Sequence, residues 1–243
     1  MSIIDTSAHL NRWRTRPLAE KALLAIGMLL IAVAVPSWEG SLVVAAIMIV
    51  VTLWGARVSP VTWWHALATP LGFLLIGSLT LAFQVKGWHV SLAPYGIELA
   101  MRLIARAFAG TLCLLFLALT TPAADLVAGL RRIGVPTEIA EMALLMYRFL
   151  FLLADTAEAM SAAQAARLGH TTRRRHMKSV SLLIANLMPR ALARAAALEV
   201  GLAARGWRGE LHVLRTVRPF SAASIAGIVL LELVVFFIAW RTR

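Results

Sequence analysis

The sequence has little of what builds a catalytic, metal-binding or disulfide-stabilised site. Cys113 is the one cysteine among 243 residues, so a disulfide framework and a cysteine-based zinc site are both excluded. The phosphate-binding pattern G-x-x-x-x-G-K-[ST] does not occur, so the chain is not expected to bind or hydrolyse ATP by itself. No H-x-x-x-H or paired-carboxylate spacing supports a metal centre. These absences argue against an enzyme and predict that the chain itself holds no metal or cofactor.

Acidic residues are also scarce, with 12 Asp and Glu against 24 Lys and Arg, a formal net charge of +12. Such a charge could indicate nucleic-acid binding. Here, however, the basic residues flank or follow apolar runs, as cytoplasmic loops and an anionic lipid surface select. Apolar residues make up 60% of the chain and the mean hydropathy is +0.79, against roughly 45–50% apolar in soluble domains. The composition therefore predicts an integral membrane protein that contacts lipid and no nucleic acid.

Five apolar runs predict membrane-spanning helices, at residues 18–35, 42–54, 61–83, 97–119 and 220–240. The second run is only about 20 Å long as a helix, against a hydrocarbon core of about 30 Å, so it must tilt, borrow flanking residues or stop short. Lys and Arg are densest between the fourth and fifth runs, so that block is expected in the cytoplasm. We therefore expect an all-α membrane protein with a membrane domain at 1–120, a cytoplasmic coupling region at 121–216 and a last span within 217–243.

The block between the fourth and fifth spans predicts two to three long, Ala-rich helices that cross. A short amphipathic helix should begin at Pro122 and stop by Gly134. A helix of about 33 residues, or about 50 Å, should follow and run to Gly169. The basic cluster at 170–178 is interpreted as a solvated loop near anionic headgroups, and Pro189 should kink or restart the next helix.

Two helix ends in this block are similar, Ala166-Arg167-Leu168-Gly169 and Ala203-Ala204-Arg205-Gly206. An arginine in the last turn complements the negative end of the helix dipole, and a glycine just beyond tolerates the left-handed cap. Ordinary helix termination explains this pattern. The alternative is that two similar tips serve two similar receptors, such as the subunits of a dimer.

The fourth predicted span carries Glu98, Arg102 and Arg106 at positions i, i+4 and i+8, so the three lie on one helix face. Ionisable groups at membrane depth are costly and are usually paired or directed into a bundle. One interpretation is a polar track for a substrate. We favour a structural ion pair that orients the helix, because no acidic cluster or intramembrane histidine accompanies it.

Further motifs occur in a recognisable order along nearly the whole chain. They are Asn11-Arg12-Trp13 with Pro17 and Lys21, Thr120-Thr121-Pro122, Tyr147-Arg148-Phe149, 163–169 and 201–211. In this order the chain resembles the transmembrane (T) component of energy-coupling factor transporters, and its local motifs look like the cobalt-type CbiQ family. The general family pattern has Ala-Arg-Gly at both tips, whereas here Leu168 intervenes at the first, as in the cobalt-type form.

The resemblance implies that the two tips dock on a dimer of cytoplasmic ATP-binding cassette subunits, which bind the ATP. By motif matching, docking falls to Ala166, Arg167, Leu168, Gly169, Ala204, Arg205 and Gly206. The long helices would cradle a separate substrate-binding membrane subunit that carries the cobalt, with a small accessory membrane subunit in some systems.

The expected function is therefore energy coupling in a cobalt importer of the bacterial inner membrane, with the coupling region in the cytoplasm. Three alternatives stay open. They are the same role in nickel import, a small integral-membrane enzyme that uses Glu98, Arg102 and Arg106 on a lipid-like substrate, and a self-sufficient channel.

Overall fold

The computed structural model describes residues 3–35, 37–86, 89–92, 96–131, 134–206 and 221–241. The chain divides into two compact units. One, the bundle unit, comprises residues 1–129 and 217–243; the other, the arm unit, comprises residues 130–216. The fold is that of an all-α membrane protein, in which one short pair of strands joins two of the helices.

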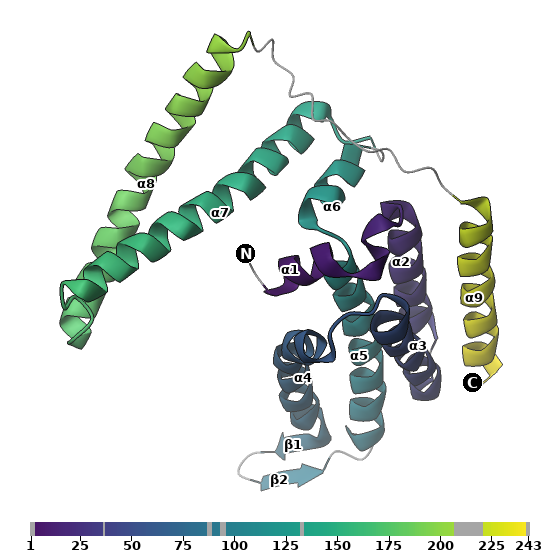
Figure 1. Cartoon of the computed structure of the whole chain (residues 1–243). Helices are drawn as coiled ribbons and strands as arrows, with labels where there is room; N and C mark the ends of the chain where they lie inside the picture. The colour runs from purple at the N-terminus through teal and green to yellow at the C-terminus, as the bar shows by residue number, and fades with distance from the viewer. Residues whose placement is uncertain are drawn as a thin grey trace. The chain divides into compact units, whose positions relative to one another are not determined.

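Most elements of the bundle unit follow one another with short connections, and its last helix comes after the arm unit in the sequence (Figure 1). They are α1 (Ile3–Leu10), the 3-10 turn η1 (Arg12–Thr15), α2 (Leu18–Ala34), α3 (Trp38–Val50), the π turn η2 (Val51–Gly55), α4 (Pro60–Ala82), α5 (Gly96–Thr120), α6 (Ala123–Leu130, at the boundary) and α9 (Ala222–Arg241). Strands β1 (Phe83–Lys86) and β2 (His89–Leu92) pair antiparallel between α4 and α5. No strand is predicted from the sequence.

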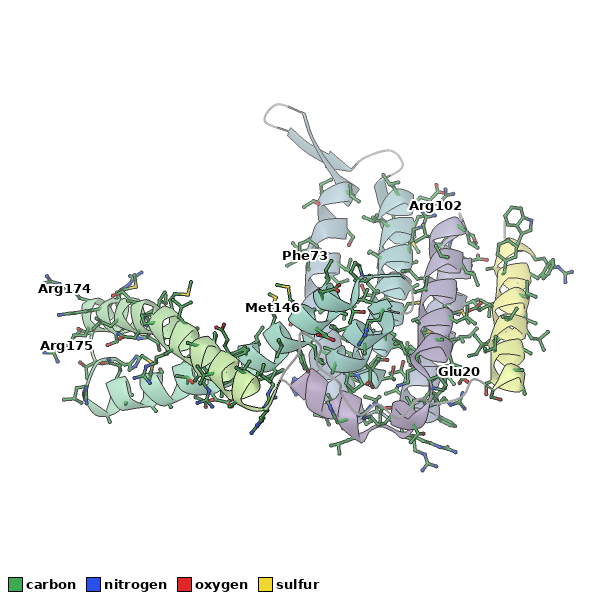
Figure 2. All side chains as sticks on the ribbon, turned by 90° about the horizontal axis from the view of Figure 1, so that it is seen from above. Glu20, Phe73, Arg102, Met146, Arg174 and Arg175 are labelled. Carbon is green, nitrogen blue, oxygen red and sulfur yellow. The ribbon has the colours of Figure 1, made fainter. Side chains whose placement is uncertain are left out.

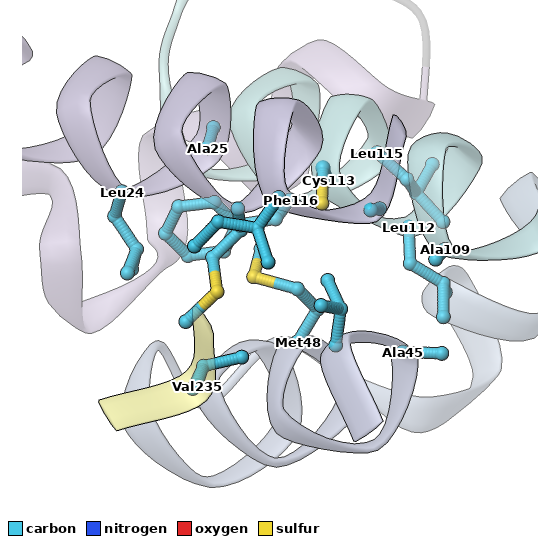
Figure 3. Packing of buried hydrophobic residues seen from close by; sticks show 14 of the residues in the cluster. Leu24, Ala25, Ala45, Met48, Ala109, Leu112, Cys113, Leu115, Phe116 and Val235 are labelled. Carbon is cyan, nitrogen blue, oxygen red and sulfur yellow. The ribbon is translucent and has the colours of Figure 1, made fainter. Parts of the chain in front are cut away.

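Helix α5 is the centre of the bundle unit, because α2, α3 and α4 all pack against it while α9 packs on α2 and α3. Phe116, Leu112 and Cys113 of α5 meet Met28 of α2 and Met48 of α3 in one apolar cluster (Figure 3). All five side chains are buried. Close packing of this kind fixes the helices relative to one another within the unit.

Five helices are long and apolar enough to cross a membrane: α3 continued by η2, α4, α5, α8 (Arg173–Ala204) and α9. The chain is thus a multi-pass membrane protein. The number agrees with the five expected spans, but the members differ. Helix α2 was expected to span but has 17 residues, which is the lower limit for a span. Helix α8 was not expected to span, and it meets the criteria for a span by length and composition alone.

The second apolar run is longer than predicted. It extends from Trp38 to Gly55, 18 residues, or about 27 Å. The helix begins early because Ser37 caps it by accepting a hydrogen bond from the Gly40 amide, and because the buried Ser41 hydroxyl bonds to the carbonyl of Ser37. Residues 38–41, which precede the predicted run, are therefore helical.

The arm unit consists of two long helices, α7 (Thr137–Ala166) and α8, joined by a tight turn. They meet at the turn and diverge from it (Figure 1). Helix α7 has 30 residues, which agrees with the prediction. The basic cluster is not a loop as expected: α8 begins at Arg173 because the Thr172 side chain caps it. Pro189 lies inside α8, which does not restart there.

Candidate functional site

The two arginines of the predicted tips occupy the same backbone position. Arg167 is the C-cap of α7, with φ −90° and ψ 18°, and Arg205 is the C-cap of α8, with φ −90° and ψ 7°. Both side chains are exposed. Within the described ranges neither guanidinium makes a hydrogen bond or an ion pair. Each tip therefore presents an uncommitted positive charge on a helix end.

The residue after each arginine is left-handed: Leu168 has φ +59° and Gly206 has φ +71°. The Leu168 amide donates to the carbonyl of Ala165 at 2.9 Å, and the Gly206 amide to that of Ala203 at 3.0 Å. These bonds connect equivalent positions of a C-terminal cap. The expectation that Gly169 supplies the left-handed residue is wrong, because Leu168 takes that conformation at a cost of about 1–2 kcal/mol. Leu168 thus stands where the second tip has Gly206.

Gly169 is required for a different reason, which is space. A Cβ atom there would lie 2.5 Å from the Ser179 hydroxyl and 2.8 Å from the carbonyl oxygen of Gln164. The Ser179 hydroxyl donates to the Gly169 carbonyl at 3.2 Å, and the Gly169 amide donates to Gln164 at 2.8 Å. The start of α8 is therefore closed tightly against the end of α7.

Two histidines make further polar contacts beside the first tip. The Nδ1 atoms of His170 and His176 are 2.6 Å apart, and Nε2 of His170 lies 3.4 Å from the Ser161 carbonyl oxygen of α7. Because a carbonyl oxygen only accepts, Nε2 of His170 is the donor in its contact with Ser161. The Thr171 hydroxyl also donates to the Leu168 carbonyl at 2.9 Å. The turn is thus bonded on both sides.

The first tip also carries the densest positive charge. Arg173, Arg174, Arg175 and Lys178 are all exposed on the first turns of α8. Figure 2 shows Arg174 and Arg175 projecting outward at the turn end of the arm unit. The second tip lies at the other end of α8, a helix of 32 residues. The two tips are therefore separated by about 48 Å of helix.

A cavity of about 480 Å³ lies between the diverging arms. It is lined by Leu145, Arg148, Phe149, Leu152, Asp155, Arg194, Ala197 and Leu198. Arg148 and Asp155 come from α7 and Arg194 from α8, and no ion pair joins them in the part of the chain that the structure describes. Arg148, which the sequence offered only as a family motif, is thus located where the two arms face each other.

The predicted polar track on α5 divides into two separate interactions. Arg102 pairs with Glu98 at 2.6 Å, with both side chains about half exposed. Arg106 instead donates to the carbonyl of Val35, the C-cap of α2, at 3.1 Å. The structure therefore joins Glu98 to Arg102 and assigns Arg106 to the end of another helix.

Sequence reasoning missed a buried polar clamp in the bundle unit. The Lys21 ammonium, 1% exposed, donates to the carbonyl of Thr120 at 2.7 Å. The Asn11 amide donates to the carbonyl of Leu119 at 3.2 Å. A cation at the C-terminal end of α5 complements its dipole. Asn11, Lys21 and Thr120 all belong to the motifs that carry the family resemblance, but nothing local in the sequence indicates that they meet.

Glu232 was also missed, although an acidic residue within an apolar run is a visible signal. It lies in the middle of α9, and its buried Oε1 atom makes no hydrogen bond with the residues described. The carboxylate lies against Gly27 of α2, where an added Cβ would overlap it. Gly27 thus provides the room that this carboxyl group occupies.

The comparisons with known proteins agree on one family. The model of the CbiQ cobalt transport protein family matches residues 10–214. The cobalt transport protein CbiQ of Rhodobacter capsulatus is 52% identical over 228 residues, which cover 93% of each chain. The protein of the same name in Salmonella typhimurium is 27% identical and covers 88% of this chain and all of the relative.

A third relative, from Methanocorpusculum labreanum, is named as a fused cobalt transport protein CbiMQ; it is 31% identical over 84% of this chain but only 37% of its own length. All three relatives are named as cobalt transport proteins. With a family model that covers most of its length and a half-identical relative, the chain belongs to the CbiQ family of cobalt transport proteins.

Proposed function

We propose that this chain is the transmembrane coupling component of an energy-coupling factor importer for cobalt ions, and that its two tips dock on a dimer of cytoplasmic ATP-binding cassette subunits. The observation that supports this most is the equivalence of Arg167 and Arg205, two exposed and unpaired C-cap arginines one helix length apart. Two equal anchors at that spacing suit two similar receptors, whereas ordinary helix ends need neither the match nor the free charge.

An exposed arginine is well suited to anchor a protein interface. The guanidinium offers a rigid fork of donors to carboxylate or carbonyl oxygens, and such an anchor in a desolvated pocket contributes about 2 kcal/mol or more. Ala166 and Ala204 precede the two arginines and add no bulk. Small neighbours let the helix end enter a groove closely.

The helices that carry the tips are long enough to transmit motion. Helix α7 has 30 residues and α8 has 32. When the ATPase dimer closes on ATP, the separation of its two grooves changes, and the arms carry this displacement to a substrate-binding membrane subunit. The free faces of α7 and α8 offer that subunit a surface, since only Ala140 and Ser179 of these helices are buried.

We assign the arm unit to the cytoplasmic side of the bacterial inner membrane, although α8 is apolar enough to span. Arg173, Arg174, Arg175 and Lys178 begin this helix, and Arg190 and Arg194 interrupt its second half. Charged residues within a span are costly, and a concentration of Lys and Arg favours the cytoplasm. The arms would then lie along the anionic headgroups.

Cobalt is proposed as the cargo on the names of the relatives. The metal would be held by the substrate-binding subunit and ATP by the ATPase pair. The relative named as a fused CbiMQ supports a membrane partner, because its name joins this component to a second one in a single chain. An accessory membrane subunit would complete some complexes.

The test is charge reversal at both tips in the assembled complex. The double variant Arg167→Glu with Arg205→Glu should release the ATPase subunits during purification in detergent and abolish cobalt uptake. The new carboxylates would be repelled by the carboxylate or carbonyl oxygens of the ATPase grooves that are proposed to receive the arginines. Arg174→Glu with Arg175→Glu is the matched control: it reverses two exposed arginines beside the first tip and should leave the ATPase bound. Retention of the ATPase by the tip variant, with uptake intact, would refute the docking role.

A further inference from the structure

Leu168 presents an apolar side chain in a conformation that this residue type disfavours. Its φ of +59° lies in the left-handed region, and its side chain is 62% exposed. A glycine would take this conformation without strain, as Gly206 does at the second tip. Nothing inside the described chain therefore explains why a leucine stands here.

The surrounding turn holds Leu168 in this conformation from both sides. Its amide donates to Ala165, and its carbonyl accepts from the Thr171 hydroxyl. The next residue, Gly169, is pinned between Gln164 and Ser179. Strained residues that the surroundings hold in place cluster at sites of function. The fold thus fixes the direction in which Leu168 projects, one residue beyond the anchoring arginine.

We propose that Leu168 is a second, apolar anchor of the first tip, which enters a hydrophobic pocket beside the acidic or carbonyl cluster that receives Arg167. This inference rests on the proposed docking of the tips. It makes the two tips unequal although their backbones match: the first binds through a charge and an apolar side chain, the second through a charge followed by glycine. The first tip is then the tighter attachment to the ATPase pair.

Leu168→Asn separates polarity from backbone effects, because asparagine has nearly the shape of leucine and tolerates the left-handed conformation. In the complete complex we expect about ten-fold weaker binding of the ATPase, a change of about 1.4 kcal/mol, measured as the ATPase concentration that half-saturates the chain in lipid nanodiscs. Leu168→Met keeps an apolar side chain and should retain most of the affinity. Leu192→Asn replaces an equally exposed leucine in α8, 62%, and should leave ATPase binding unchanged.

The thermal stability of the chain without ATPase shows whether these variants fold. Leu168→Asn should be at least as stable as the wild type, because the left-handed strain is reduced. Unchanged affinity in Leu168→Asn, when Arg167→Glu does lose the ATPase, would overturn the apolar anchor and leave tip docking intact. If Arg167→Glu also binds normally, the proposed function fails first. Equal losses in Leu168→Asn and Leu192→Asn would likewise overturn the assignment.

Discussion

In the bundle unit the long helices bury faces against α5 and against each other, whereas in the arm unit α7 and α8 bury few residues and leave the rest exposed or partly exposed. Phe116, Met28 and Met48 are fully buried in the bundle unit. The described part of the arm unit buries only Ala140 and Ser179. A helix gains most of its stability from packing an apolar face. The bundle unit is thus stabilised by contacts within itself, whereas α7 and α8 have faces that the described chain does not cover.

The largest expected effect is on the free energy of unfolding, when a side chain in the buried core of the bundle unit is truncated. Phe116→Ala removes a buried ring at the centre of the bundle unit and should cost about 3–5 kcal/mol of unfolding free energy. Met146→Ala truncates a side chain of α7 that is 69% exposed and should change it by less than about 0.5 kcal/mol. Thermal unfolding in detergent, without partners, measures both. Similar losses would show that the comparison between the units is wrong.

A smaller effect compares the turn between α7 and α8 with an uncovered position within α8. Gly169→Ala places a methyl group against Ser179 and the backbone of Gln164, and should destabilise the arm unit by about 1–3 kcal/mol. Gly201→Ala lies within α8 with no atom near its Cβ, and should stabilise the helix by about 0.5–1 kcal/mol. Hydrogen exchange of amides in α7 and α8 reports the two signs. A stabilising Gly169→Ala would contradict the tight turn.

The smallest effect concerns the ion pair on α5. Glu98→Gln removes one partner of Arg102, with both side chains about half exposed, and should cost less than about 1 kcal/mol. We expect the pair to orient a helix and not to conduct substrate, so cobalt uptake by the complex should persist. Loss of uptake with ATPase association intact would instead favour the polar track or the enzymatic alternative.

How far the sequence predicts this structure depends on whether a signal is local. Helix α7 is predicted almost to its ends because the helical pattern is unbroken from Pro136 to Gly169, and the two arginine tips follow from short local motifs. The left-handed Leu168 was not predicted, because a glycine was expected to take that conformation and the close approach of Ser179 to Gly169 is visible only in the structure. The clamp from Lys21 to Thr120 joins positions 99 residues apart, and such pairs are visible only in the fold.

In the proposed function both arginine tips contact the ATPase subunits, and crosslinking detects such a contact in the assembled complex. Cys113 is buried, so Ala166→Cys or Ala204→Cys adds an accessible thiol beside an untouched arginine. With a short thiol-directed photocrosslinker in membranes, each variant should capture an ATPase subunit, whereas Ala193→Cys in the middle of α8 should not. Failure of both tip positions to capture the ATPase, in membranes that still import cobalt, would contradict the account.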